Sequence, residues 1–96
     1  FVLKMLQMFV ADIPATVAEI KTAFYNNDLA VVKQLSHRIK PAIDSMGITS
    51  LKTEIRRIEE LSGNQINSPE LENLILQLEQ VIAQTVEQIK ANELGE

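Results

Sequence analysis

A single histidine is the residue of this chain best suited to chemistry, and its neighbours indicate which chemistry. His37 is the only histidine. Lys33 precedes it by four residues and Lys40 follows it by three, so on a helix both ammonium groups lie within about a turn of the imidazole. Neutral imidazole is a nucleophile near neutral pH, and a nearby cation stabilises a phosphoryl group bound to it. A nucleophile with a positioned cation is what phosphoryl transfer requires.

Other kinds of site find little support in the sequence. With one histidine and no cysteine, the residues for a cysteine-based zinc site or a thiolate nucleophile are missing. No glycine-rich phosphate loop is present, so a kinase site is not expected. We therefore expect no metal, no cofactor and no enzyme activity with a nucleotide site of its own.

Size and charge limit the class of protein and its partners. The 96 residues allow one domain, covering 1–96. A net charge of −4 argues against a nucleic-acid binder, which needs a basic surface. No apolar run approaches the roughly 18 residues of a membrane span, and the opening residues lack a signal-peptide cleavage site. Together with the absence of cysteine, these features lead us to expect a cytoplasmic protein without membrane insertion.

Helical periodicity runs through the whole chain. Apolar residues recur every three or four positions between turn-forming residues, which predicts helices over about 1–11, 13–26, 28–46, 49–62 and 68–92. Asp12 and Pro14 indicate a break between the first two. We expect an all-α fold, an antiparallel up-down four-helix bundle, with a short additional N-terminal helix across one end or side.

The same periodicity predicts that His37 points to solvent. Leu35 and Ile39 belong to the apolar stripe of the helix 28–46, and each lies roughly 160° from His37 around the helix axis. Other outward residues near the imidazole form what we call the His37 face. It comprises Ala30, Lys33, Gln34, Pro41 and Asp44.

The residues that follow His37 resemble the signature of histidine-containing phosphotransfer domains. That family reads His-x-x-Lys-Gly, with a glycine ten residues after the histidine and a leucine four residues later. Here Lys40, Gly47 and Leu51 stand at those positions, and Pro41 replaces the first glycine. Proline inside a helix removes an amide donor, so we expect the helix to bend or loosen there. The resemblance extends over nearly the whole chain and implies a four-helix bundle with the histidine exposed midway along a long helix.

The resemblance also implies a function. His37 would accept a phosphoryl group from an aspartate of a receiver domain and pass it to another receiver, with Lys40 stabilising the group. The partners would be response-regulator receiver domains and a hybrid sensor kinase, and we expect a monomer. Two alternatives stay open: the dimerisation and phosphoacceptor helices of a sensor histidine kinase, and a helical adaptor with an incidental surface histidine.

Two apolar lines on the first predicted helix indicate where a receiver docks. One is expected to be buried and consists of Val2, Leu6 and Phe9. The other is expected to be exposed and consists of Phe1, Met5 and Met8. Because flexible methionine suits adaptable binding surfaces, we expect the footprint of a receiver to combine the His37 face with Met5 and Met8.

Overall fold

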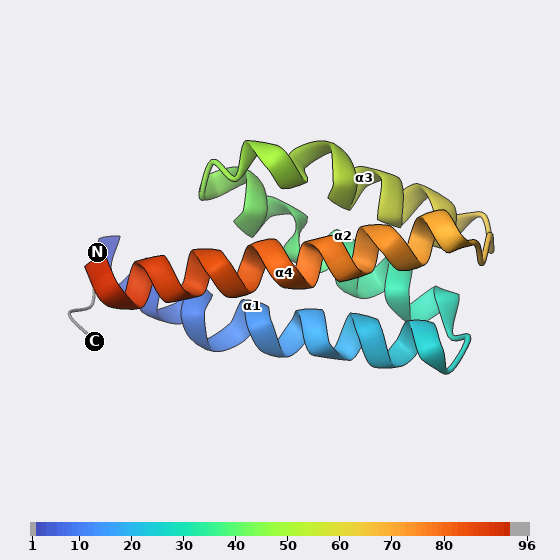
Figure 1. Cartoon of the computed structure of the whole chain (residues 1–96), viewed down its shortest axis with the longest axis horizontal. Helices are drawn as coiled ribbons and strands as arrows, with labels where there is room; N and C mark the ends of the chain where they lie inside the picture. Colours follow the sequence, from blue (N-terminus) through green and yellow to red (C-terminus); the bar gives the residue numbers. More distant parts are fainter. Residues whose placement is uncertain (1, 93–96) are drawn as a thin grey trace.

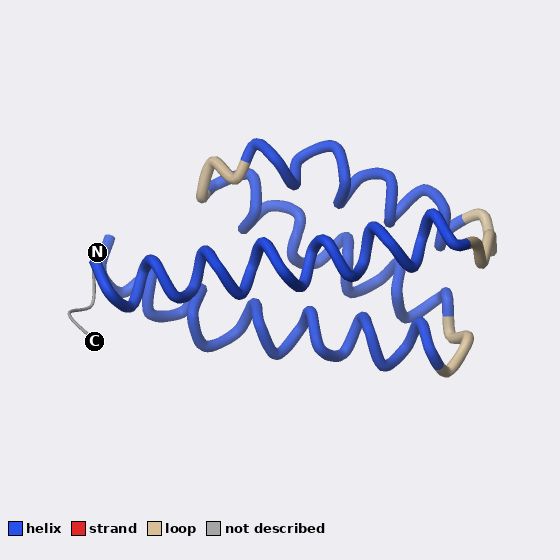
Figure 2. The backbone as a smooth tube through the Cα atoms, in the orientation of Figure 1, coloured by secondary structure: helices blue, strands red, loops and turns tan. Residues whose placement is uncertain are grey.

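Four helices make up almost all of the described chain. The computed structural model describes residues 2–92, of which Val2 is described for its backbone alone. The helices are α1 (Val2–Tyr25), α2 (Leu29–Ser45), α3 (Thr49–Gly63) and α4 (Pro69–Asn92), joined by short loops (Figure 2). No strand occurs within residues 2–92, which confirms the all-helical prediction. None of these helices is long and apolar enough to cross a membrane.

The chain changes direction at every loop (Figure 1). α1 and α3 run towards one end of the molecule, and α2 and α4 run back. α1 packs against α2 and α4, and α3 packs against the same two helices, so the four surround one core. α1 and α4, with 24 residues each, extend beyond the shorter α2–α3 hairpin at the end where α1 begins.

Contacts within a few residues define where α2 and α4 begin and where α2 ends. The Asp28 carboxylate accepts a hydrogen bond from the Val31 backbone N–H at 3.4 Å, and the Ser68 hydroxyl accepts one from the Leu71 N–H at 3.3 Å. Gly47 follows α2 with a positive φ of 68°, a conformation that glycine adopts at little cost. The resulting connection is short, so α2 and α3 must pack as direct neighbours.

The predicted break near Pro14 is wrong. α1 is one helix with Pro14 in its interior. The described residues therefore contain no separate short N-terminal helix, and Asp12 lies inside α1 rather than at the start of a helix. Leu6, Phe9 and Ile13, which precede the proline, are all buried. Burial of each such side chain contributes about 1.5–3 kcal/mol, so together they outweigh the roughly 3 kcal/mol cost of an interior proline.

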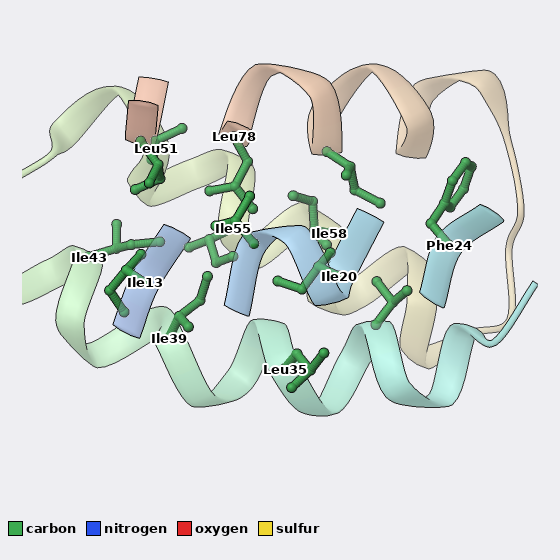
Figure 3. Close-up of a cluster of buried hydrophobic side chains, with 14 of the residues drawn as sticks. Ile13, Ile20, Phe24, Leu35, Ile39, Ile43, Leu51, Ile55, Ile58 and Leu78 are labelled. Atoms are coloured by element: carbon green, nitrogen blue, oxygen red, sulfur yellow. The ribbon is translucent and has the colours of Figure 1, made fainter. Parts of the chain in front are cut away.

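Buried aliphatic side chains from all four helices fill the centre of the bundle (Figure 3). The least exposed include Ile20, Val32, Ile39, Ile43, Leu51, Ile55, Ile58, Leu71, Ile75, Leu78 and Ile82. The buried residues of α2 and α3 define the inward faces of these two helices. They thereby also determine which side chains of α2 and α3 are exposed to solvent along their shared edge.

Candidate functional site

His37 projects from the middle of α2 into solvent. Leu35 and Ile39, two residues to either side, are buried in the core, and the His37 side chain is 70% exposed. The prediction of an outward imidazole is thus confirmed. The exposed ring is accessible to a partner on the side that faces away from the bundle.

A carboxylate on α3 holds this ring and a neighbouring cation. Glu59 Oε2 lies 2.6 Å from His37 Nδ1, and Lys40 Nζ donates to Glu59 Oε1 at 2.8 Å. The bond from Lys40 lowers the pKa of the Glu59 carboxyl, and the bond from His37 lowers it further, although partial burial acts the other way. Glu59 is therefore ionised at neutral pH and binds both residues at once.

This contact determines which imidazole nitrogen is free to react. An ionised carboxylate has acceptor atoms only, so the short contact with Nδ1 requires the proton to reside on that nitrogen. In the neutral ring the lone pair then belongs to Nε2, the nitrogen away from Glu59. Nε2 can attack an electrophilic phosphorus atom, and the carboxylate offsets the positive charge that the ring gains.

The sequence pattern did not single out Glu59, but the α2–α3 turn contains a signal for it. His37 lies eleven residues before Ile48, and Glu59 lies eleven residues after it. Residues equally distant from the turn of an antiparallel helix pair lie level with each other, because the rise per residue is the same in both helices. Lys33 and Gly63 obey the same rule: the Lys33 Cδ is 3.3 Å from where a Cβ on Gly63 would lie.

Comparison with known families shows to which family the chain belongs. The family model described as the Hpt domain matches residues 4–92, from the first turn of α1 to the end of α4. The chain belongs to the Hpt domain family. Hpt domains take part in histidine phosphotransfer in two-component phosphorelays, as carriers of the phosphoryl group. No curated protein and no solved structure matches the chain.

The remaining residues of the His37 face lie on α2 around the histidine of this Hpt domain. Gln34 and Pro41 are exposed, and α2 continues through Pro41 to its end. Asp44 is held by Arg56 of α3, whose two terminal guanidinium nitrogens donate to its carboxylate at 2.7 and 3.1 Å. Arg56, like Glu59, is a residue that helix periodicity alone did not bring to notice.

Met5 and Met8 of α1 lie beside the end of α2 in the Hpt domain. Both are exposed, and they line a groove of about 250 Å³ between the start of α1 and the end of α2. The opposite wall consists of Ala42 and Ser45 of α2 and of Met46, which follows the helix. His37, Pro41 and Ser45 follow one another at i+4 spacing, so one ridge leads from the imidazole to the groove over roughly 12 Å. The expected exposure of Phe1 and burial of Val2 concern side chains outside the described residues.

Proposed function

We propose that this Hpt domain carries a phosphoryl group on His37 from one receiver domain to another. The observation that carries the proposal is an exposed Nε2 on a ring whose Nδ1 is held by the ionised Glu59, in a chain of the Hpt family. The donor would be a phospho-aspartate of one receiver and the acceptor an aspartate of the next. One of these receivers can belong to a hybrid sensor kinase.

Loading begins when the Nε2 lone pair attacks the phosphorus of the acyl phosphate. The N–P bond forms while the bond from phosphorus to the aspartyl oxygen breaks, and the aspartate carboxylate leaves with that electron pair. The ring keeps its proton on Nδ1 and gains a positive charge, which the Glu59 carboxylate offsets. Lys40, one turn along α2, supplies a cation to the phosphoryl oxygens. Transfer to a second receiver reverses these bond changes.

Incubation with receiver domains labelled by radioactive acetyl phosphate tests this proposal. We expect acid-labile, alkali-stable phosphate on the parent and none on His37→Gln, with the helical content of both unchanged. Lys40→Ala should slow transfer or shorten the lifetime of the phosphohistidine, with little change in melting temperature. Lys90→Ala, an exposed lysine near the end of α4, is the control. Labelling of His37→Gln would refute the assignment.

The docking surface of the receiver is a second part of the proposal. We propose that it covers the His37 face and the groove lined by Met5 and Met8, because the ridge on α2 joins the two and a typical interface buries roughly 800 Å² per partner. Met5→Glu with Met8→Glu should weaken receiver binding and slow transfer. Leu76→Glu, at an exposed leucine on α4, should change neither. Unaltered affinity of the double variant, or its unfolding, would contradict this docking site.

We further propose that residues 1–96 form one Hpt domain that acts as a monomer in the cytoplasm. Light scattering measures the oligomeric state and cell fractionation the compartment. A stable dimer would instead favour the dimerisation helices of a sensor histidine kinase. Failure of every receiver to label His37 would favour a helical adaptor with an incidental histidine.

A further inference from the structure

Four charged side chains form a compact group beside His37 on the edge shared by α2 and α3. Lys40 and Asp44 come from α2, and Arg56 and Glu59 come from α3. We call them the charge square. Both ion pairs cross between the helices: Arg56 with Asp44 at 2.7 Å, and Lys40 with Glu59 at 2.8 Å. Glu59 also holds the imidazole, so the square is joined directly to the reactive ring.

Each member of the charge square has a second possible partner within the square, on its own helix. Lys40 and Asp44 are spaced i, i+4, and Arg56 and Glu59 are spaced i, i+3, the spacings at which side chains on one helix meet. The bond to Arg56 is the main cause that lowers the pKa of the Asp44 carboxyl, and Lys52 and then Lys40 add to that effect. Asp44 in turn raises the pKa of Arg56, with a smaller contribution from Glu59. Rotation of these long side chains would exchange the partners. Arg56 would then also give up the bond that it donates to the Lys52 carbonyl at 2.8 Å.

A phosphoryl group on His37 changes the balance between the two sets. It brings a charge of about −1.5 to −2 within one turn of Lys40, and so attracts the ammonium more strongly than the single charge of Glu59 does. Glu59 would then lose its hydrogen bond from Lys40 while still bound to Nδ1. A partly buried carboxylate that loses a cation favours a new one. Arg56 stands three residues before Glu59 on α3, a spacing at which the two side chains can meet.

We propose that Arg56 is a positioning residue for the phosphorylated state: when the phosphoryl group draws Lys40 away, Arg56 leaves Asp44 and binds Glu59. Arg56 thereby keeps Glu59 in place against Nδ1. Asp44 opposes this exchange, since its ion pair with Arg56 must break. The inference rests on the proposed role of His37 as phosphoacceptor.

Equilibrium labelling with phosphoramidate tests the exchange without a partner protein. Nε2 displaces ammonia from phosphorus, so the ratio of phosphorylated to free protein at fixed phosphoramidate and ammonium reports the stability of the phosphohistidine. Arg56→Gln should lower this ratio roughly two- to fivefold, the range for exposed ion pairs. Asp44→Asn should raise it by a similar factor, and Arg56→Lys should restore part of the loss.

Arg57→Gln is the matched control. Arg57 is as exposed as Arg56, at 42% against 43%, but it pairs with Glu60 and Glu70 away from the ring. We expect the parent ratio for this variant. A ratio for Arg56→Gln equal to that of Arg57→Gln would overturn the role of Arg56 and leave the proposed function standing.

A double variant separates exchange of partners from simple addition of charges. If Asp44 acts by holding Arg56, Asp44→Asn should change the ratio in the parent and have no effect in Arg56→Gln. An equal rise in both backgrounds would overturn the exchange, because charge repulsion alone would explain it. Failure of phosphoramidate to label His37 of the parent would overturn the assignment of Nε2 as nucleophile, and both proposals with it.

Discussion

The bond between Glu59 and His37 makes a quantitative prediction about phosphorylation rate. Nδ1 and Oε2 are 2.6 Å apart, and a hydrogen bond to a charged group contributes about 1.5–3 kcal/mol. Because the imidazole is 70% exposed, solvent screens the interaction and we take about 1 kcal/mol. Glu59→Ala should therefore be phosphorylated roughly fivefold more slowly, since part of the population then carries the ring proton on Nε2.

Glu59→Gln separates the hydrogen bond from the charge. The amide oxygen still accepts from Nδ1–H but cannot offset the positive ring, so we expect a rate between those of the parent and Glu59→Ala. The assay is the initial rate of labelling by phosphoramidate, with imidazole ¹⁵N chemical shifts to report the tautomer. Glu60→Ala, which removes a carboxylate paired with Arg57, is the control. Parent-like labelling of Glu59→Ala, or a proton that stays on its Nδ1, would refute the reasoning.

Three further predictions concern stability. The pKa of Glu59 is lowered in the folded protein, so its stabilising effect is present above its ordinary pKa of 4.5 and is lost as pH falls through the lower, folded pKa. Between pH 7 and pH 3, the free energy of unfolding measured in urea should therefore fall less for Glu59→Gln than for the parent. Pro41→Ala restores a donor to the His37 carbonyl and should raise the melting temperature by roughly 4–8 °C, for a gain of about 1 kcal/mol; a fall would show that the packing requires proline. Ser36 has a buried hydroxyl without a hydrogen-bond partner, so Ser36→Ala should be as stable as the parent or more stable. Ser62→Ala loses a bond to the Ile58 carbonyl at 2.6 Å. In thermal unfolding, Ser62→Ala should therefore be the less stable of the two variants.

The outward position of His37 could be predicted from its own helix. Helix periodicity is a local property: once Leu35 and Ile39 are assigned to the core, the geometry of the helix determines where His37 points. The caps at Asp28 and Ser68 and the positive φ of Gly47 are equally local, because each depends on bonds or sterics within a few residues. Such features follow from the sequence close to each of them.

The continuity of α1 could not be predicted in the same way. Asp12 and Pro14 are local signals for a helix start, and they are sound ones in isolation. The deciding contribution is the burial of Leu6 and Phe9 in a core shared with the other helices. The periodicity of the first residues predicts this burial, but it does not say whether the two segments form one helix or two. Residues far away in the chain decide that, because they supply the surface against which Leu6 and Phe9 pack.

By itself, then, the sequence determined an all-helical chain with one exposed histidine and a lysine one turn away, because these depend on spacing along a single helix. Only the tertiary structure decided that Glu59 meets the ring and that Arg56 meets Asp44. Glu59 is separated from His37 by 22 positions, and its contact exists because the turn around Gly47 sets the register of α2 against α3. The exposure of the proposed nucleophile is thus a property of one helix, whereas the nitrogen that Glu59 leaves free is a property of how two helices pack.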